Sequence, residues 1–217
     1  MKPVIFAFDF SMNKPAMCAY INDEIEFYVW PSKIDKVSLE ALQNADIHVF
    51  DRELPAMKDG EFNEHTLICE HVNRAVKLAG MISNKICDIL QEHNITSYED
   101  VIIANEGFAF GSHGDAILDL SGYKYILMHA LMSKGFTNFK TYAPTTIKST
   151  AGCCKKGMGK NDMIAKLGEE DNSLHTIFNI IGNAPEQLKK KTNFVMCVDD
   201  IADSYWCLKT VIRKENI

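Results

Sequence analysis

The sequence predicts a mixed α/β fold in which a five-stranded sheet is flanked by helices. Three short runs of β-forming residues follow one another within the first 30 residues, and only turn residues separate them. Two further short runs, Val101–Glu106 and Asn138–Tyr142, come later, and each follows a longer segment with helical periodicity. A series of strands followed by alternating helices and strands favours one mixed sheet with helices packed on it.

Length and composition limit the kind of protein this can be. With 217 residues, 47% of them hydrophobic, the chain is long enough for one large domain with a buried core. The apolar run near the N-terminus, Val4–Phe8, stops at Asp9 and is too short for a signal peptide or a membrane span. The seven cysteines are odd in number and include no Cys-x-x-Cys pair, so we expect a reduced, cytoplasmic protein.

The charge of the chain is unevenly distributed. The net charge of −6 argues against a protein that binds nucleic acid over its whole surface. Between Lys124 and Lys166, however, eight lysines accompany one acid, so this segment carries +7 and the rest of the chain −13. Because these lysines span turn-rich sequence as well as helix, we expect a local phosphate-binding surface rather than an ordinary solvated helix face.

The first predicted strand, Val4–Phe10, is apolar except for Asp9. A lone carboxylate in a buried strand is costly unless it is paired or binds a metal ion, although an Asp can also simply end a strand and begin a turn. The strands Ala16–Ile21 and Ile25–Trp30 follow on either side of an Asn22-Asp23 turn and complete an antiparallel meander. This meander therefore offers a candidate acid where its first strand ends.

The next segment, 31–64, is acidic, with eight acids against four basic residues. Its pattern indicates a short helix near Leu39 and a strand near 47–50, and breaker residues interrupt the remainder. We treat it as an elaboration of the core and assign it no chemistry. From about His65 to Glu92, apolar residues recur every three or four positions, which predicts a long helix.

A second carboxylate, Glu106, ends an apolar strand and leads into a loop with spaced glycines. Strand ends that face a loop are where α/β folds place ligand sites, although a solvent-facing Glu at a strand terminus is about as common. The loop also carries Phe108 and Phe110. Such aromatic residues could stack on or wedge between bases beside a phosphate-handling site, or they could simply be core residues.

The second half of the chain predicts further helices around one more strand. Residues Ala116–Lys134 form an amphipathic pattern that is apolar enough to face both a sheet and a partner chain. After the strand at 138–142, Pro144 suits the first turn of a helix. Residues 152–160 mix glycines with lysines, which predicts a phosphate-contacting loop before another helix begins near Asn161.

The last predicted helix, about Val198–Arg213, carries Asp199, Asp200 and Asp203 among apolar residues. Asp200 and Asp203 are three positions apart and therefore share one face of the helix. Two carboxylates held side by side repel each other unless a cation lies between them, which indicates a divalent-metal site. The alternative is that these acids cap the helix or occupy its first turn, where the helix dipole favours negative charge.

Taken together, these segments resemble the RuvC-like Holliday-junction resolvases, notably their phage-type members, within the RNase H-like superfamily. Five short motifs carry the resemblance: Asp9-Phe-Ser11, Glu106-Gly-Phe-Ala-Phe-Gly111, Tyr142-Ala-Pro-Thr-Thr-Ile-Lys148, Gly157-Met-Gly-Lys160 and Asp200-Ile-Ala-Asp203-Ser-Tyr-Trp206. Their order spans nearly the whole chain except 31–64. The resemblance implies a single RNase H-like nuclease domain over 1–217, with the acidic elaboration at about 31–64.

The resemblance implies four metal-binding and catalytic carboxylates, Asp9, Glu106, Asp200 and Asp203, and leaves open whether Asp199 takes the place of Asp200. They would hold two Mg²⁺ ions in each active site, with Mn²⁺ able to substitute. Oxygen ligands suit Mg²⁺ where His and Cys would not. Two such ions about 4 Å apart can activate a water and stabilise the leaving oxygen of a phosphodiester.

The resemblance also implies how DNA would be bound. Lys148 and Lys160 would be catalytic residues beside the scissile phosphate, and one of the two loop phenylalanines would disturb base stacking at the junction centre. A two-fold homodimer would place two sites on one four-way junction and cut two strands in a paired reaction. The residues expected to contact DNA are Phe108, Phe110, Lys148, Lys155, Lys156 and Lys160.

The function implied is that of a crossover junction endodeoxyribonuclease, which cuts four-way (Holliday) junctions in DNA recombination and repair. The nearest alternative is another RNase H-like nuclease that acts on branched DNA or RNA–DNA hybrids. An actin-like phosphotransferase also opens with a strand ending in Asp, but it should carry a second glycine-rich phosphate loop, which we do not find. A binding module without catalysis would gain nothing from carboxylates that face phosphate. The protein would act in the cytoplasm, that of the host if a phage encodes it, without a membrane partner.

Overall fold

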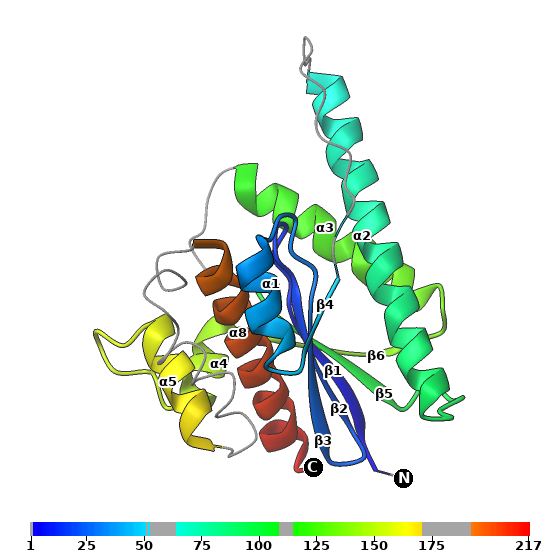
Figure 1. Cartoon of the computed structure of the whole chain (residues 1–217). Helices are drawn as coiled ribbons and strands as arrows, with labels where there is room; N and C mark the ends of the chain where they lie inside the picture. The colour runs from blue at the N-terminus through cyan, green and yellow to red at the C-terminus, as the bar shows by residue number, and fades with distance from the viewer. Residues whose placement is uncertain (1, 51, 53–63, 109–114, 171–191) are drawn as a thin grey trace.

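The centre of the molecule is one mixed sheet of six strands in the order β4-β3-β2-β1-β5-β6 (Figure 1). The prediction of five strands is wrong by one, because β4 (Ile47–Val49) of the acidic segment joins the sheet as a short edge strand parallel to β3. The computed structural model describes residues 2–50, 52, 64–108, 115–170 and 192–217.

The first three strands form the antiparallel meander that the sequence predicts. They are β1 (Val4–Asp9), β2 (Ala16–Ile21) and β3 (Glu24–Val29), each paired with the next. Asn22 and Asp23 connect β2 to β3 with φ angles of 55° and 71°. Two consecutive left-handed residues match the twist of a tight hairpin, and Asn and Asp tolerate this conformation better than other non-glycine residues.

The remaining strands run parallel to β1 and place two acids at the end of the sheet where these strands finish. β5 (Val101–Glu106) pairs with β1, and β6 (Asn138–Tyr142) pairs with β5. Parallel strands point the same way, so Asp9 and Glu106, the last residues of β1 and β5, lie at the same end of the sheet. The register pairs the residues just before them, so the two acids are neighbours on adjacent strands.

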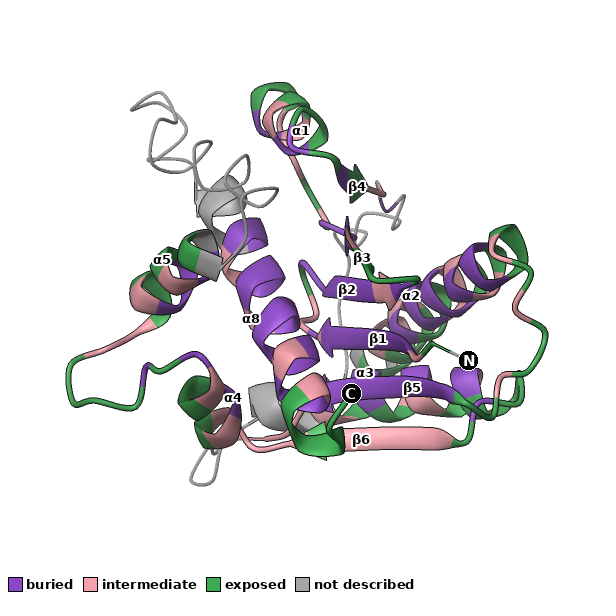
Figure 2. Ribbon diagram, turned by 90° about the horizontal axis from the view of Figure 1, so that it is seen from below, coloured by how far each residue is buried: buried purple, intermediate pink, exposed green. Residues whose placement is uncertain are grey.

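An apolar core covers each face of the sheet, so the central strands are buried on both sides (Figure 2). On one face Ile5 packs in a cluster with residues of α8 (Thr192–Glu215). On the other face Phe6 packs with residues of α2 (Glu64–Glu92) and α3 (Asp115–Met132). None of the described helices combines the length and the apolar character needed to cross a bilayer.

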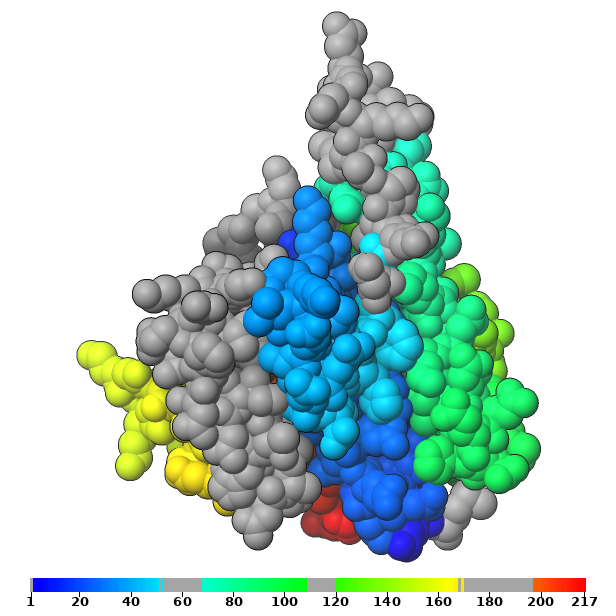
Figure 3. Space-filling model, in the orientation of Figure 1, coloured from blue at the N-terminus to red at the C-terminus, as the bar shows by residue number. Residues whose placement is uncertain are grey.

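Three shorter helices complete the described structure. α1 (Lys36–Gln43) lies beside β4 on the surface, where Figure 3 shows the two elements in blue and light blue. α4 (Pro144–Thr150) begins at the predicted proline, and α5 (Lys160–Glu170) follows the glycine- and lysine-rich loop. The indole Nε1 of Trp206 donates to the backbone oxygen of Met163 over 2.9 Å, which joins α5 to α8.

The helix that carries the three aspartates begins earlier than predicted. It begins at Thr192 rather than near Val198, so Asp199 lies about two turns inside it. The alternative that these acids cap the helix or occupy its first turn is therefore wrong. Asp has a poor helix propensity, but the packing of α8 against β1, β2 and β5 outweighs this local preference.

The packing of α8 on the sheet generates a test of stability. Leu208 is fully buried in the core between α8 and the sheet, so Leu208→Ala should remove buried surface and leave a cavity. We expect its free energy of unfolding in urea to fall by about 3 kcal/mol. The matched control is Val37→Ala on α1, which is 49% exposed and should change stability by less than about 0.5 kcal/mol. Equal losses in the two variants would contradict the observed packing.

Candidate active site

The structure brings together the four carboxylates that the motifs singled out. Asp9 ends β1, Glu106 ends β5, and α8 carries Asp200 and Asp203 across the same edge of the sheet. Asp9 lies close enough to Asp200 and Asp203, and Glu106 close enough to Asp9 and Asp203, for their charges to repel. Asp200 is buried and the other three are half-buried, so little water screens this repulsion.

Hydrogen bonds orient Asp200 within the cluster. The Ser11 hydroxyl, two residues after Asp9, donates to Asp200 Oδ2 over 3.2 Å, and Ser11 Oγ in turn accepts from the backbone N–H of Lys14 over 3.0 Å. The carboxyl groups of Asp9 and Asp200 lie close enough for each to affect the pKa of the other.

Burial raises the pKa of every carboxyl group in the cluster. For Glu106, burial first and then repulsion by Asp9 and Asp203 raise the pKa to about 7. For Asp200, burial raises the pKa to about 7 although Lys160 and Ser11 oppose the rise. Burial, Asp200 and Asp203 raise the pKa of Asp9 well above its ordinary value. The charged form of these acids is therefore disfavoured in the bare site, and a bound cation would stabilise it.

Lys160 is the basic residue in closest contact with the acids. Its Nζ lies 3.3 Å from Asp203 Oδ2, at the start of α5. Burial alone would lower the pKa of Lys160, but the attraction of the surrounding aspartates outweighs it and the pKa is raised. Lys148 on α4 is exposed, and its charge also reaches Asp203 and lowers the pKa of that carboxyl. Both predicted basic residues thus border the cluster.

The structure distinguishes the places of Asp199 and Asp200. Asp200 accepts a hydrogen bond from Ser11 and interacts electrostatically with Asp9, so it belongs to the group at the end of β1. Asp199 is half-buried and interacts with Lys160 and Asp203 instead, and burial raises its pKa. Successive residues of a helix point about 100° apart, which accounts for the separation. Asp200 is the better-placed partner of Asp9, and Asp199 borders the site on the Lys160 side.

The donor set fits a hard divalent cation. The cluster offers carboxylate oxygens, and the buried Oδ1 of Asp199 has no hydrogen-bond partner among the described residues. In this arrangement, however, no three Asp, Glu, His or Cys side chains of the described residues are placed to hold one ion between them, and the Lys160 ammonium pairs with Asp203. Binding of Mg²⁺ would thus require the carboxylates to draw closer than they lie here.

The other predicted DNA-contacting residues belong to two loops, one between α4 and α5 and one that follows Glu106 in the sequence. Lys155 and Lys156 are exposed in the loop between α4 and α5, which Figure 2 shows extending from the body of the molecule. Phe108 is half-buried two residues after Glu106. Phe110 lies outside the described residues.

Two residues at the site escaped the sequence analysis. Lys124, which was counted only as part of the basic segment, is 7% exposed and donates to the backbone oxygen of Glu106. Arg52 belongs to the segment to which no chemistry was assigned, yet it is 3% exposed and donates to the backbone oxygens of Met12, over 2.9 Å, and Asn13. Arg52 therefore ties the acidic segment to the loop after β1. The sequence gives one signal for these contacts: Lys124 is a basic residue in an apolar pattern, and Arg52 is a basic residue in an acidic segment.

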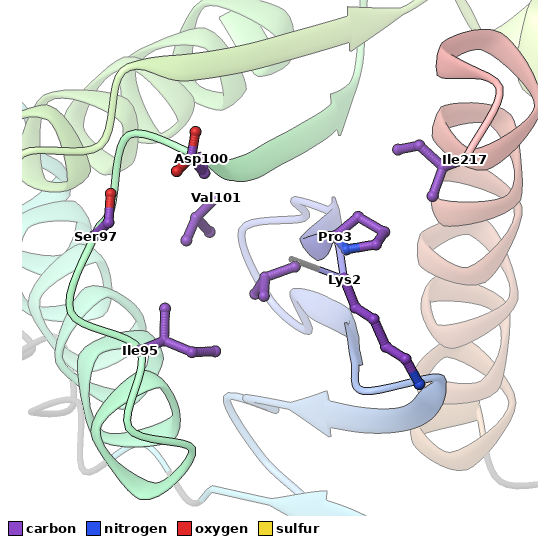
Figure 4. A pocket seen from close by; sticks show the side chains of 8 residues that line it. Lys2, Pro3, Ile95, Ser97, Asp100, Val101 and Ile217 are labelled. Carbon is purple, nitrogen blue, oxygen red and sulfur yellow. The ribbon is translucent and has the colours of Figure 1, made fainter.

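A separate cavity of about 580 Å³ lies at the other end of the sheet (Figure 4). Val4 and Val101, which begin β1 and β5, line it, whereas the carboxylates lie where these strands end. Six-residue strands separate the two places by about 17 Å. The cavity is therefore not part of the carboxylate site. Its lining residues are Lys2, Pro3, Val4, Ile95, Ser97, Asp100, Val101 and Ile217.

The sequence matches no family model and no curated protein. Among solved structures, the chain is similar to RuvC of Thermus thermophilus, with a TM-score of 0.45, 8% identity and coverage of 98% of this chain and 96% of that chain. RuvC of T. thermophilus in complex with a Holliday junction substrate gives a TM-score of 0.44, 9% identity and coverage of 98% and 96%.

The chain is also similar to the yeast mitochondrial Holliday junction resolvase Ydc2, with a TM-score of 0.49, 13% identity and coverage of 99% of this chain and 79% of that chain. These structural neighbours are RuvC and a Holliday junction resolvase, the group of proteins that the sequence motifs resemble. The phage-type assignment stays a prediction.

The clustered acids generate a prediction about stability without metal. Glu106 and Asp200 have ordinary pKa values of 4.5 and 3.8 but values of about 7 in the folded chain. A group whose pKa is higher in the folded than in the unfolded chain stabilises the fold at pH values below its unfolded pKa. This stabilisation is lost as the pH rises through its folded pKa. In EDTA we therefore expect the Tm of the wild type to fall as the pH is raised from about 4 to about 7. The Tm of Asp200→Asn should fall less over the same range.

The control for this measurement is Asp88→Asn, which changes an exposed acid on α2 far along the chain from the cluster. It should keep the pH dependence of the wild type. If Tm depends on pH in Asp200→Asn as it does in the wild type and in the control, the raised pKa of Asp200 does not affect stability.

Proposed function

We propose that this chain is a metal-dependent endonuclease that resolves four-way DNA junctions by paired phosphodiester hydrolysis. The observation that carries the proposal is the meeting of Asp9, Glu106, Asp200 and Asp203 beside Lys160. Buried acids with raised pKa values destabilise a fold, so their convergence from three separate elements favours a catalytic role. The choice of a junction as the substrate follows from the resemblance of the five motifs to RuvC-like resolvases.

The four carboxylates would hold two Mg²⁺ ions, with Mn²⁺ able to substitute. When bound, the ions supply an activated water and stabilise charge on the leaving oxygen. Ser11 keeps one oxygen of Asp200 oriented through its hydrogen bond. Asp9 and Glu106 are fixed by the pairing of β1 with β5, so the relative positions of these two acids do not depend on a loop.

The lysines around the cluster would bind the phosphate backbone. Lys160 pairs with Asp203, and Lys148 lies near enough to lower the pKa of that acid, so both place positive charge where a scissile phosphate would approach. Lys155 and Lys156 are exposed on the loop between them and would contact phosphates farther along the strand. This local surface would allow a chain whose net charge is −6 to bind DNA.

A second copy of the chain is the partner we propose for the outer surface of α2 and α3. Ile68, Val72 and Val76 follow one another at four-residue spacing on α2 and are 55%, 47% and 54% exposed. Tyr125 and Met132 on α3, seven residues apart and thus on one helix face, are 61% and 59% exposed. These helices cover the sheet face opposite α8, so a homodimer formed here leaves both carboxylate sites accessible.

Cutting of synthetic substrates tests the nuclease. With Mg²⁺ or Mn²⁺ we expect the protein to cut a four-way junction in preference to a flap, an RNA–DNA hybrid or plain duplex. Asp9→Asn or Glu106→Gln should reduce the cutting rate by at least about 100-fold, because each loses a metal-binding charge, while junction binding in a gel-shift assay persists.

Asp88→Asn is the matched acid-to-amide control and should cut like the wild type. Wild-type rates in the two active-site variants would remove those residues from catalysis. Preference for the hybrid would favour the alternative nuclease, and turnover of ATP without cutting would favour the phosphotransferase.

The proposed dimer surface has its own test. Val72→Glu combined with Val76→Glu should give a monomer by light scattering, because each buried carboxylate would oppose association. The monomer should nick one strand of a junction without the paired second cut. Val37→Glu places the same change on exposed α1 and should remain a dimer. A wild-type monomer, or a dimer of the double variant, would contradict the proposed surface.

A further inference from the structure

Lys124 is a buried lysine on α3 whose amine reaches the end of β5. Its Nζ donates a hydrogen bond to the backbone oxygen of Glu106 and lies 4.7 Å from the centre of the Phe108 ring. One ammonium group thus contacts both the residue that supplies a candidate metal ligand and one of the two phenylalanines expected to act at the junction centre. Neither contact follows from the five motifs, because Lys124 lies in none of them.

A charge at this position needs a reason other than packing. Lysine is seldom fully buried, and removing its ammonium from water is costly unless the charge is compensated. Here the carbonyl of Glu106, the face of the Phe108 ring and the charges of Glu106 and Asp9 provide compensation. An apolar side chain of similar length would fill the same space without that cost, but it would leave the Glu106 carbonyl without this donor.

The backbone that joins Glu106 to Phe108 is held on its other side as well. The N–H of Gly107 donates to the backbone oxygen of Tyr142 on β6 over 2.7 Å. A Cβ atom at Gly107 would lie 3.3 Å from that oxygen, so the approach of the two strands is close. The segment from Glu106 to Phe108 is therefore fixed between β6 and the amine of Lys124.

We infer that Lys124 is the positioning residue that sets the Phe108 ring at a defined place relative to the carboxylate site. The inference rests on the proposed function and extends it to the way in which the junction centre is recognised. The ammonium lies over one face of the ring, so the opposite face is the one that would stack on DNA. Phe108 would therefore stack on a single unpaired base at the junction centre rather than insert between two bases.

Lys124→Met is the variant that tests this role, and Lys134→Met, which removes an exposed lysine just beyond α3, is its matched control. The readout is the fluorescence of 2-aminopurine next to the crossover of a synthetic four-way junction, which rises when the base unstacks. In Ca²⁺, without cutting, we expect Lys124→Met to remain folded and to keep its junction affinity but to lose most of the fluorescence rise. In Mg²⁺ its cutting rate should fall about tenfold. Lys134→Met should match the wild type in each measurement.

A double-mutant cycle with Phe108→Leu separates positioning from a general structural effect. If Lys124 acts through Phe108, adding Lys124→Met to Phe108→Leu should cause little further loss of fluorescence or cutting. Should Lys124→Met fail to fold, Lys124→Gln takes its place, because it keeps a donor for the Glu106 carbonyl and loses only the cation. Additive losses, or a wild-type fluorescence rise in the Lys124 variant, would overturn the inference. Absence of cutting by the wild type would instead contradict the proposed function.

Discussion

Mutual repulsion among buried carboxylates is the constraint on which the rest of the site depends. Asp9, Glu106, Asp200 and Asp203 are held near one another where water is scarce, and burial raises the pKa of each. Repelling groups move apart unless rigid elements hold them. Here two paired strands and a long packed helix provide that rigidity, so the energy needed to keep the acids together comes from the core of the molecule.

The chain offsets this repulsion with cations and donors that come from other elements. Lys160 reaches Asp203 from α5, Ser11 reaches Asp200 from the loop after β1, and Lys124 reaches the Glu106 backbone from α3. Arg52 of the acidic segment holds the same loop through two backbone oxygens. Through Arg52 the acidic segment 31–64 is thus attached to the loop that carries Ser11, and it also adds β4 to the sheet.

Most elements could be predicted because their signals are local. The hairpin turn at Asn22-Asp23, the strand Asn138–Tyr142 and the start of α4 at Pro144 each depend on the preferences of a few adjacent residues. The start of α8 could not be predicted in this way, because its first turn is stabilised by the packing of the whole helix. Pairing of the three-residue β4 depends on a partner strand far along the chain, and nothing in its own residues specifies that partner.

By itself, the sequence determined which acids, lysines and aromatic residues were candidates, and it placed Asp9 and Glu106 at strand ends. Only the tertiary structure decided that the two strands pair in parallel with the acids adjacent, and that Asp200 rather than Asp199 meets Asp9. It alone revealed the roles of Lys124 and Arg52. The physical reason is that strand pairing, helix rotation and the compensation of a buried charge depend on partners distant in the chain, whereas propensity and periodicity reflect only near neighbours.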